Sequence, residues 1–384
     1  MNNILLAAGL MLAAASSYAS IDITVEEIRL YKADDVIPEI VNRYDEQAES
    51  FSSQLQETEN FSAAKELTVK YAEALWDKAT SDLQHTESSY DDRPLYWARL
   101  KMTKALRLRG ESLGLTSKQV QQLISMVEHH SRGYNDIKFQ NDSNVKILIT
   151  GFDPFLLDRN IKQSNPSGVA ALRLDNQRIE HDGKVIEIQS AMFPVRYQDF
   201  DDGSVETVVE PYLKNNSIDM LATISMGREN FDLEHFPGRR RSASAPDNNN
   251  LYSGGSDESP LIPKQGKELL QGPEFVEYSL PYEAMMKADG PYEINDNRKV
   301  TTLNKTFEPN TLDELKGEVA VRGGGGGYLS NEISYRTVNL GNKLGTTVPT
   351  GHIHTPRIQE YDKDVIKAIV EQIKKMLVIG VTNS

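Results

Sequence analysis

The N-terminal third of the chain places apolar residues at helical spacing. Apolar side chains recur every three or four positions between residues 67 and 75, between 95 and 105, and between 120 and 127. Thr24 with Glu27, and Thr116 with Gln119, have the spacing of capping boxes, which begin helices. Pro94 suits the first turn of a helix. The pattern therefore predicts an all-helical N-terminal region over residues 20–140.

From residue 145 onwards, short apolar runs alternate with helical stretches. The runs at residues 145–150, 185–190, 219–225 and 352–354 predict strands. Helices are predicted after Pro166, over residues 203–213 and over residues 362–377. Residues 248–272 and 289–309 are rich in Gly, Pro, Asn and Ser, so we predict loops or insertions there. The alternation predicts an α/β sheet in a second unit, residues 145–384.

The N-terminus has the pattern of a secretory signal. An apolar stretch runs from Ile4 to Ala15, and Ser17-Tyr18-Ala19 places small residues where a signal peptidase reads the chain. A membrane-spanning helix needs about 20 apolar residues, so this stretch is too short to be an anchor. We expect the signal peptide, residues 1–19, to be cleaved after Ala19. The mature protein is then periplasmic or secreted, without membrane insertion.

The composition removes several classes of function. The formal net charge is −14, and an acidic protein repels nucleic acids and anionic membranes, so neither is expected as a partner. The chain has no cysteine, which excludes disulfides, zinc–thiolate sites and catalysis by a thiolate. The glycine run at residues 323–327 is not followed by the Lys of a phosphate loop. No cofactor is implied.

Several motifs of the α/β part occur in the order found in pyroglutamyl peptidase I, also called pyrrolidone-carboxylate peptidase. The most specific is Gly-Phe-Asp-Pro-Phe at residues 151–155, directly after a predicted strand and followed by Asn-Pro-Ser at 165–167. Further matches lie at residues 193–195, 227–228, 245–248, 280–281, 329–331 and 351–356. The chain thus resembles this family over about residues 145–380. The resemblance implies a doubly wound sheet flanked by helices, with a Cys-His-Glu site that removes an N-terminal pyroglutamate.

Two of the three catalytic positions are occupied as the resemblance implies. Glu234 stands at the family's catalytic glutamate and His354 at its histidine. In such a site the histidine deprotonates the nucleophile, and the acid orients the imidazole. His352 lies on the same strand face as His354 and is a less favoured substitute. A His-x-His pair can bind a metal, but no third ligand stands at a recognisable spacing, so no metal is expected.

The third position, the nucleophile, is not a cysteine. Aligning residues 330–339 with the family's Ser-x-x-Ala-Gly-x-aromatic-x-Cys-Asn/Asp pattern puts Val338 at the cysteine. Valine cannot attack a carbonyl, and the connection from Val338 to His354 is shorter than is usual for the family. The nearest hydroxyl groups belong to Thr337, Ser334 and Ser330.

The substrate pocket implied by the resemblance is matched at some positions and changed at others. Phe152 and Phe155 match aromatic residues that sandwich the pyroglutamyl ring, and Asn165 matches a polar residue close to them. Arg228 ends the matched Gly-Arg pair. The family's Gly-Gln-Ala-Gly-Gly-Arg segment appears here as Thr-Ile-Ser-Met-Gly-Arg at residues 223–228, which lacks the glutamine and its hydrogen bonds.

Two functions remain open at this point. The favoured one is an exported protein without cysteine-peptidase activity that keeps a scaffold for a peptide or a pyroglutamate-like small molecule. The alternative is a hydrolase that removes N-terminal pyroglutamate, or a related group, with a substitute Ser or Thr nucleophile such as Thr337 or Ser334. The family is often homo-oligomeric, and the N-terminal helices either cover or replace its interface.

Overall fold

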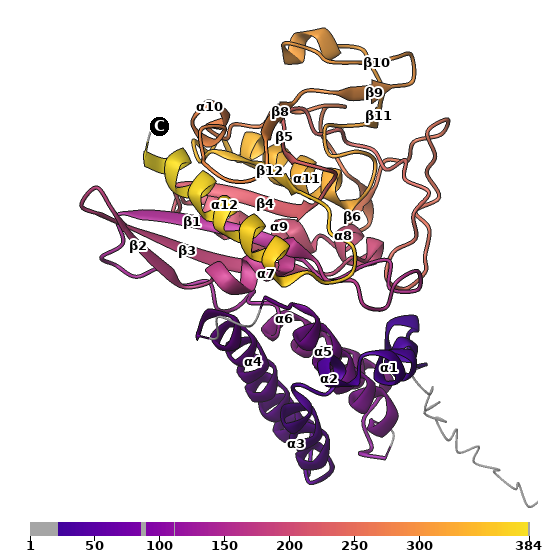
Figure 1. Cartoon of the computed structure of the whole chain (residues 1–384). Helices are drawn as coiled ribbons and strands as arrows, with labels where there is room; N and C mark the ends of the chain where they lie inside the picture. Colours follow the sequence, from indigo (N-terminus) through magenta and orange to yellow (C-terminus); the bar gives the residue numbers. More distant parts are fainter. Residues whose placement is uncertain (1–21, 86–89, 111, 383–384) are drawn as a thin grey trace, which may run out of the picture.

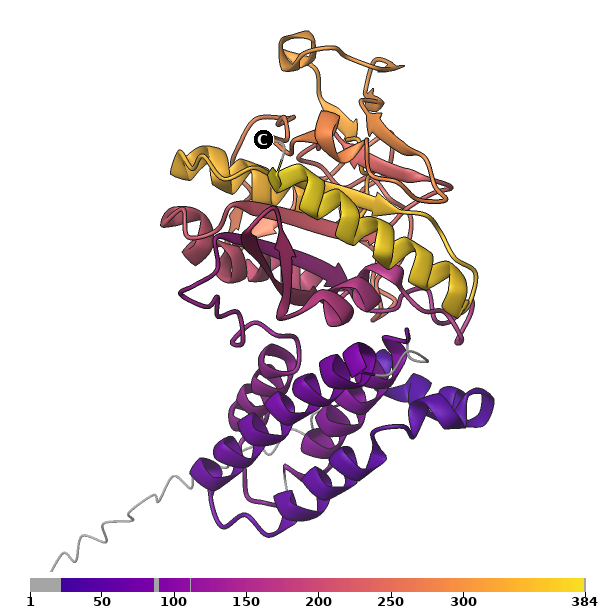
Figure 2. The same ribbon diagram turned by 60° about the vertical axis from the view of Figure 1, so that its left-hand side comes forward.

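The computed structural model describes residues 22–85, 90–110 and 112–382. The predicted signal peptide, residues 1–19, lies outside these residues. A helical region lies on one side of the molecule and an α/β part on the other, as Figures 1 and 2 show. Among the described residues, no helix combines the length and apolar character needed to cross a bilayer.

The described part of the N-terminal region is helical. Its elements are α1 (Val25–Val36), α2 (Pro38–Val41), α3 (Asp45–Gln56), α4 (Phe61–His85), α5 (Arg93–Arg109) and α6 (Ser117–His130). Both capping boxes are confirmed: Thr24 Oγ1 accepts a hydrogen bond from Glu27 N at 3.2 Å, and Thr116 Oγ1 accepts one from Gln119 N at 3.3 Å. Pro94 lies in the first turn of α5, as predicted.

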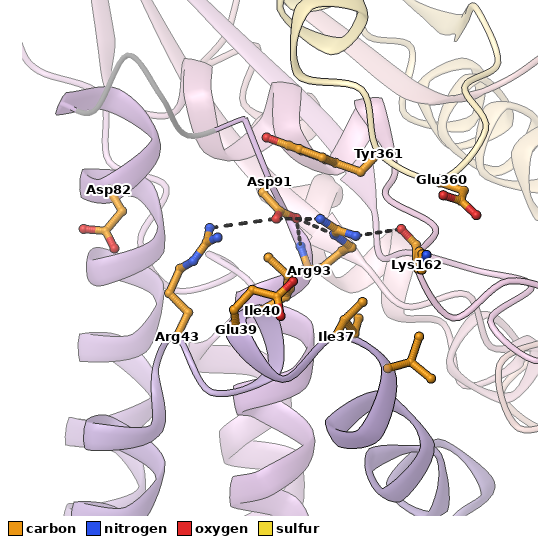
Figure 3. A pocket seen from close by; sticks show the side chains of 11 residues that line it. Ile37, Glu39, Ile40, Arg43, Asp82, Asp91, Arg93, Lys162, Glu360 and Tyr361 are labelled. Atoms are coloured by element: carbon orange, nitrogen blue, oxygen red, sulfur yellow. Dashed lines mark hydrogen bonds and ion pairs between the residues drawn. The ribbon is translucent and has the colours of Figure 1, made fainter.

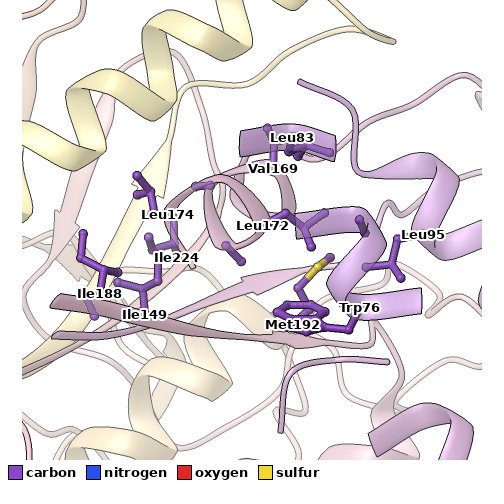
Figure 4. Packing of buried hydrophobic residues seen from close by; sticks show 14 of the residues in the cluster. Trp76, Leu83, Leu95, Ile149, Val169, Leu172, Leu174, Ile188, Met192 and Ile224 are labelled. Atoms are coloured by element: carbon purple, nitrogen blue, oxygen red, sulfur yellow. The ribbon is translucent and has the colours of Figure 1, made fainter. Parts of the chain in front are cut away.

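Helix α4 packs its apolar face against the α/β part. Trp76 and Leu83 of α4 belong to the same hydrophobic cluster as Val169, Leu172 and Ile149 of the α/β part. Figure 4 shows these side chains around one helix that covers the sheet. The helical region and the α/β part therefore share a continuous core.

A seven-stranded sheet forms the centre of the α/β part. Its strands, in spatial order, are β2 (Gln177–His181), β3 (Lys184–Phe193), β1 (Val145–Phe152), β4 (Met220–Met226), β12 (Thr350–Thr355), β5 (Phe231–Glu234) and β8 (Ile294–Asn297). Strands β3, β1, β4 and β12 are parallel to one another. Strands β2 and β5 are antiparallel to their neighbours β3 and β12, and β8 is parallel to β5.

Helices cover both faces of this sheet (Figure 1). Along β1, Ile147 and Ile149 belong to a cluster with α7 (Pro166–Leu174) and α12 (Lys363–Thr382). Leu148, between them, belongs to a cluster with α9 (Ser204–Lys214) and the start of α11 (Leu329–Leu344). Alternate residues of a strand face opposite sides. The predicted fold class, an α/β sheet flanked by helices and preceded by a helical segment, is therefore confirmed.

The predicted loops contain additional short elements. Residues 289–309 include β8 at the edge of the main sheet, together with β9 (Val300–Thr302) and β10 (Thr306–Phe307). Strand β9 pairs with β10 and with β11 (Ala320–Arg322), and residues 248–272 contain the pair β6 (Lys264–Gln265) and β7 (Glu268–Leu269). The loop prediction was wrong at these strands, which form by pairing with a neighbour; in β8 this pairing outweighs the low strand propensity of Asn and Asp. The remaining elements are α8 (Tyr197–Asp201), α10 (Tyr282–Met285) and a 3₁₀ turn (Leu312–Leu315).

The strand order creates a crevice between β1 and β4. After β1 the chain adds β3 on one side, and β4 then pairs with the other side of β1. The connections that follow two such neighbouring strands diverge, so the carboxyl ends of the strands leave an opening where ligands bind in this class of fold. Phe152 ends β1, and Met226 ends β4.

Candidate active site

His354 and Glu234 form a buried pair on neighbouring strands. Asp232 of β5 lies opposite His354 of β12, and Glu234 lies at the end of the same strand β5. His354 Nδ1 is 2.5 Å from Glu234 Oε1. Glu234 Oε2 accepts a second hydrogen bond from Asn297 Nδ2 at 2.7 Å, which gives the buried carboxylate the partners it needs. The sequence prediction paired the same two residues, and the structure brings them into contact.

The hydrogen bond to Glu234 leaves the other nitrogen of His354 available. An acceptor at Nδ1 favours the tautomer that carries its proton there, so that Nε2 keeps a lone pair. Nε2 has no hydrogen-bond partner within the described part of the chain. Glu234 thus orients the imidazole of His354 so that Nε2 can act as a base.

Two glycines permit the close packing of this pair. A Cβ atom at Gly227, directly after β4, would lie 2.6 Å from the Cβ of His354. A Cβ atom at Gly324 would lie 2.6 Å from Glu234 Oε2. Both distances are well below the optimal separation of non-bonded atoms, so a larger residue at either position would displace the pair.

His352 has a different environment from His354. Its Nδ1 lies 2.7 Å from Thr223 Oγ1, and its Nε2 lies 2.7 Å from Ser225 Oγ. Burial, together with the neighbouring His354, holds the pKa of His352 well below its usual range, so the ring is neutral. No group of three or more His, Cys, Asp or Glu side chains suited to a metal ion occurs among the described residues.

A small cavity opens at the crevice between β1 and β4. It is lined by Phe152, Phe155, Asn165, Val195, Ser225, Met226, Tyr328, Leu329 and Ser330. Its volume is about 20 Å³, which is room for about one water molecule. The structure thus brings together three of the residues that the sequence predicted for the pocket, and a ligand enters only if lining side chains move.

Helix α11 begins at this cavity. Ser330 is its second residue and is half-buried. Tyr328, at the N-cap, makes no side-chain capping bond, so the first N–H groups of the helix lack a side-chain acceptor there. Asn331 anchors the helix start, because its side chain bonds both the N–H and the C=O of Gly238. The positive end of the helix dipole therefore lies at the cavity wall.

The register of β4 and β12 relates Ser330 to His354. Ser225 of β4 lies opposite His354, and Met226 lies opposite Thr355. Ser225 and Met226 line the cavity together with Ser330. Ser330, at the N-terminus of α11, thus lines the same cavity as Ser225, the residue opposite His354.

Two family models match the chain. The model described as the PA0049 N-terminal domain matches residues 11–128, and the model of the PA0049 C-terminal domain matches residues 146–266 and 276–359. The second match alone covers more than half of the chain. The chain belongs to the PA0049 family. A curated member, described as uncharacterized protein PA0049 of Pseudomonas aeruginosa strain PAO1, is 26% identical over 393 residues, which cover 79% of this chain and 71% of that protein.

Solved structures similar to this member of the PA0049 family are pyrrolidone carboxyl peptidases. One is the crystal structure of Pf-PCP(1-204)-C, at 19% identity and a TM-score of 0.43, covering 62% of this chain and 97% of that chain. Another is the enzyme of the hyperthermophile Pyrococcus furiosus with its cysteine-free mutant, at 19% identity and a TM-score of 0.42, covering 62% and 99%. These values describe a distant likeness.

The residues that the sequence placed at or beside the nucleophile lie inside α11. Val338 is buried in the main hydrophobic cluster and does not line the cavity. Thr337 Oγ1 donates within its own helix, toward the carbonyl oxygens of Ile333 and Ser334. Ser334 Oγ is buried and has no hydrogen-bond partner in the described residues. Of the three hydroxyl candidates, the cavity includes only Ser330.

Arg228 is not among the residues that line the cavity. Its side chain is 59% exposed and pairs with Asp232 at 3.0 Å. It also approaches Glu234 Oε1, at 3.8 Å. Arg228 therefore adds positive charge next to the carboxylate and does not form part of the pocket wall.

A larger cavity, of about 650 Å³, lies where the helical region meets the loops before α7 and α12 (Figure 3). Its central charges are already paired: Asp91 with Arg43 at 3.8 Å and with Arg93 at 2.7 Å. Arg93 also donates to the carbonyl oxygen of Lys162 and lies over the ring of Tyr361. None of the catalytic or pocket residues predicted from the sequence lines this cavity, so we place the candidate site at the smaller one.

Sequence reasoning missed several residues of the site. Ser225, Met226 and Tyr328 line the cavity, and Asn297 holds Glu234, but none of the four was singled out. A usable signal was present at residues 326–331, where Gly-Gly-Tyr-Leu-Ser-Asn offers a glycine, an aromatic residue and a hydroxyl at the spacing of the family pattern.

Proposed function

We propose that the protein is a serine hydrolase in which Ser330 attacks an acyl group, His354 acts as the base and Glu234 orients His354. One observation carries the proposal: Ser330, in the first turn of α11, lines the same cavity as Ser225, which lies opposite His354 in the sheet. Its hydroxyl makes no hydrogen bond to another described residue, so its proton is available to a base. In structures without substrate, the contact between nucleophile and base is often loose and tightens in the complex.

A second register of the family pattern supports Ser330. If the pattern starts at Arg322, then Gly326, Tyr328, Ser330 and Asn331 stand at its Gly, aromatic, Cys and Asn positions. The register that starts at Ser330 matches only the two ends of the pattern. The new register also lengthens the connection to the histidine, which is unusually short otherwise. Serine then replaces cysteine at the nucleophile position.

The proposed reaction is acyl transfer to the serine hydroxyl followed by hydrolysis. Ser330 Oγ bonds to the carbonyl carbon of the substrate while its proton passes to Nε2 of His354. The negative oxygen that forms is stabilised by N–H groups at the start of α11. The bond to the leaving amine then breaks, and the amine takes the proton from His354. Water then attacks the acyl carbon and gives its proton to the same nitrogen. The bond from Ser330 Oγ to the acyl carbon breaks, the acid leaves, and His354 returns the proton to Ser330 Oγ.

The cavity favours a small acyl group, and we propose an N-terminal pyroglutamyl group. Phe152 is buried and Phe155 is half-buried, which gives the cavity one firm wall and one that can move to admit a ring. Asn165 Nδ2 donates one hydrogen to the carbonyl oxygen of Asp153, at 3.0 Å. Its second hydrogen remains for a carbonyl oxygen of the substrate.

The test is turnover of a fluorogenic pyroglutamyl amide. We expect the protein to hydrolyse it, and Ser330→Ala to lower kcat/KM by about a thousandfold or more. Ser330→Cys should retain activity, whereas Val338→Cys, which places its thiol in the core, should add none. Activity that appears only in Val338→Cys would contradict the proposal. It would instead support the alignment that starts at Ser330 and places Val338 at the nucleophile position. Silence of the protein and of both cysteine variants would leave a non-catalytic binding protein as the better interpretation.

Export is also part of the proposal. The apolar leader and the small residues before Ser20 support a protein that is cleaved and released into an oxidising compartment.

A further inference from the structure

A chain of buried hydrogen bonds runs beneath the cavity. It begins at the carbonyl oxygen of Gly351, which accepts from Thr223 Oγ1 at 3.2 Å. Thr223 Oγ1 lies 2.7 Å from His352 Nδ1, and His352 Nε2 lies 2.7 Å from Ser225 Oγ. The side chains of Thr223, His352 and Ser225 are all buried, and Ser225 lines the cavity. This series of hydrogen bonds therefore ends at Ser225, in the wall of the cavity.

One arrangement of protons uses every contact in this chain. A carbonyl oxygen only accepts, so Thr223 must donate its single proton to Gly351. Thr223 Oγ1 then accepts from His352, which places the proton of the neutral ring on Nδ1. His352 Nε2 consequently carries a lone pair and accepts the proton of Ser225. The hydroxyl proton of Ser225 is thus committed to the protein, and its oxygen keeps lone pairs toward the cavity.

We infer that Ser225 is a specificity-determining residue, a fixed hydrogen-bond acceptor that selects ligands carrying an N–H or O–H donor at this wall of the cavity. The inference rests on the proposed function for the identity of the site, and it adds the direction of the hydrogen bond at Ser225. A buried oxygen that only accepts repels the lone pairs of an acceptor group and leaves it unpaired. A ligand with a ring oxygen at that place should therefore bind more weakly than the same ring with an N–H group.

A nucleophilic role for Ser225 is the competing interpretation of its short contact with His352. His352 Nδ1 has a hydroxyl rather than a carboxylate as its partner, so nothing nearby stabilises an imidazolium. The ring is completely buried and lies 4.8 Å from the ring of His354, centroid to centroid. A second positive charge there is unfavourable. Ser225 therefore orients a ligand and does not attack it.

Binding of two small ring compounds tests the inference independently of turnover. The probes are 2-pyrrolidone, which carries an N–H group, and γ-butyrolactone, which has an oxygen atom in its place. We expect 2-pyrrolidone to bind about tenfold more tightly. Ser225→Ala should abolish this preference. Thr223→Val, which keeps the shape of the side chain, frees His352 to donate from Nε2 and Ser225 to donate into the cavity, so it should remove or reverse the preference.

Ser330→Ala is the matched control, because it removes the proposed nucleophile and leaves the hydrogen-bond chain intact. It should keep the preference for 2-pyrrolidone while it abolishes turnover. A protein that binds the lactam selectively without any turnover would contradict the proposed function and support the role of Ser225. Equal affinity for the two probes, no binding of either, or an unchanged preference in folded Ser225→Ala would overturn the inference.

Discussion

At the scale of single residues, the two ring nitrogens of His354 have different surroundings. Nδ1 contacts a buried carboxylate at 2.5 Å, and Nε2 has no partner among the described residues. The carboxylate is itself held by Asn297 at 2.7 Å. A base needs this asymmetry, because only one nitrogen can receive the proton of a nucleophile while the other keeps the ring in place.

Replacing Glu234 with glutamine tests that asymmetry. The amide N–H can donate to Nδ1, which would move the ring proton to Nε2 and remove the base. We expect Glu234→Gln to lower kcat for the pyroglutamyl amide by about three to four orders of magnitude with little change in KM. Asp232→Asn, on the same strand but paired with the exposed Arg228, is the control and should change kcat less than about threefold. Equal losses in the two variants would contradict the role of Glu234.

A second residue-scale prediction concerns Asp92 and pH. Asp92 is buried and accepts hydrogen bonds from Ser164 Oγ at 2.6 Å and from Asn165 N at 3.1 Å. Burial raises the pKa of its carboxyl to about 8, above the ordinary value of 3.8. The folded protein therefore holds a proton between about pH 4 and pH 8 that the unfolded chain has released, so the free energy of unfolding decreases as pH rises from about 4, and the decrease is complete once pH passes 8.

Urea unfolding of the protein and of Asp92→Asn at several pH values checks this. The free energy of unfolding of the protein should fall relative to that of Asp92→Asn between pH 4 and pH 8, by up to a few kcal/mol. Above pH 8 the difference should stay constant. Parallel curves over the whole range would show that Asp92 titrates normally.

At the scale of elements, two helices hold the loop that carries the aromatic pocket residues. Asp153, directly after β1, is completely buried, and its carboxylate pairs with Arg99 of α5 at 3.0 Å and with Arg132, just after α6, at 2.7 Å. Phe152 and Phe155 flank this aspartate in the chain. The helical region therefore contributes to the site, because its arginines hold the segment that forms one wall of the cavity.

Removing the charge of Asp153 should weaken its contacts with Arg99 and Arg132 and destabilise the protein. Asp153→Asn leaves two buried arginines without their shared counter-charge, and we expect it to lower the free energy of unfolding by about 3–5 kcal/mol in urea titrations. Asp82→Asn breaks the pair Lys78–Asp82, which lies near the surface of one helix, and should cost less than about 1 kcal/mol. Similar losses in the two variants would argue against a supporting role of the buried cluster.

At the scale of the whole molecule, the leader predicts where the mature protein begins and where it is found. Expressed with its own N-terminus in a Gram-negative host, the protein should appear in the periplasmic fraction, and sequencing of its N-terminus should start at Ser20. Ala19→Arg should block cleavage, since the peptidase reads small residues there. An uncleaved N-terminus in the cytoplasmic fraction would contradict export.

Much of the whole-molecule fold was predictable, because it depends on local patterns. The helical caps at Thr24 and Thr116 and the central strands stand close to where the periodicity put them. The strand β8 was missed, since its residues Ile-Asn-Asp-Asn become a strand only by pairing with β5. The strand propensity of a segment carries no information about a partner strand that lies far away in the sequence.

By itself the sequence determined the alternation of strands and helices, the helical region before it, and the pairing of Glu234 with His354 that the motifs implied. Only the tertiary structure decided which of the candidate hydroxyl groups lines the cavity between β1 and β4. The residues between Ser330 and Val338 are all helical, so spacing alone allows either register, but only the first turn of α11 lies at the cavity between β1 and β4. The physical reason is that this cavity is formed by strands and a helix far apart in the chain, and its walls exist only once they pack together.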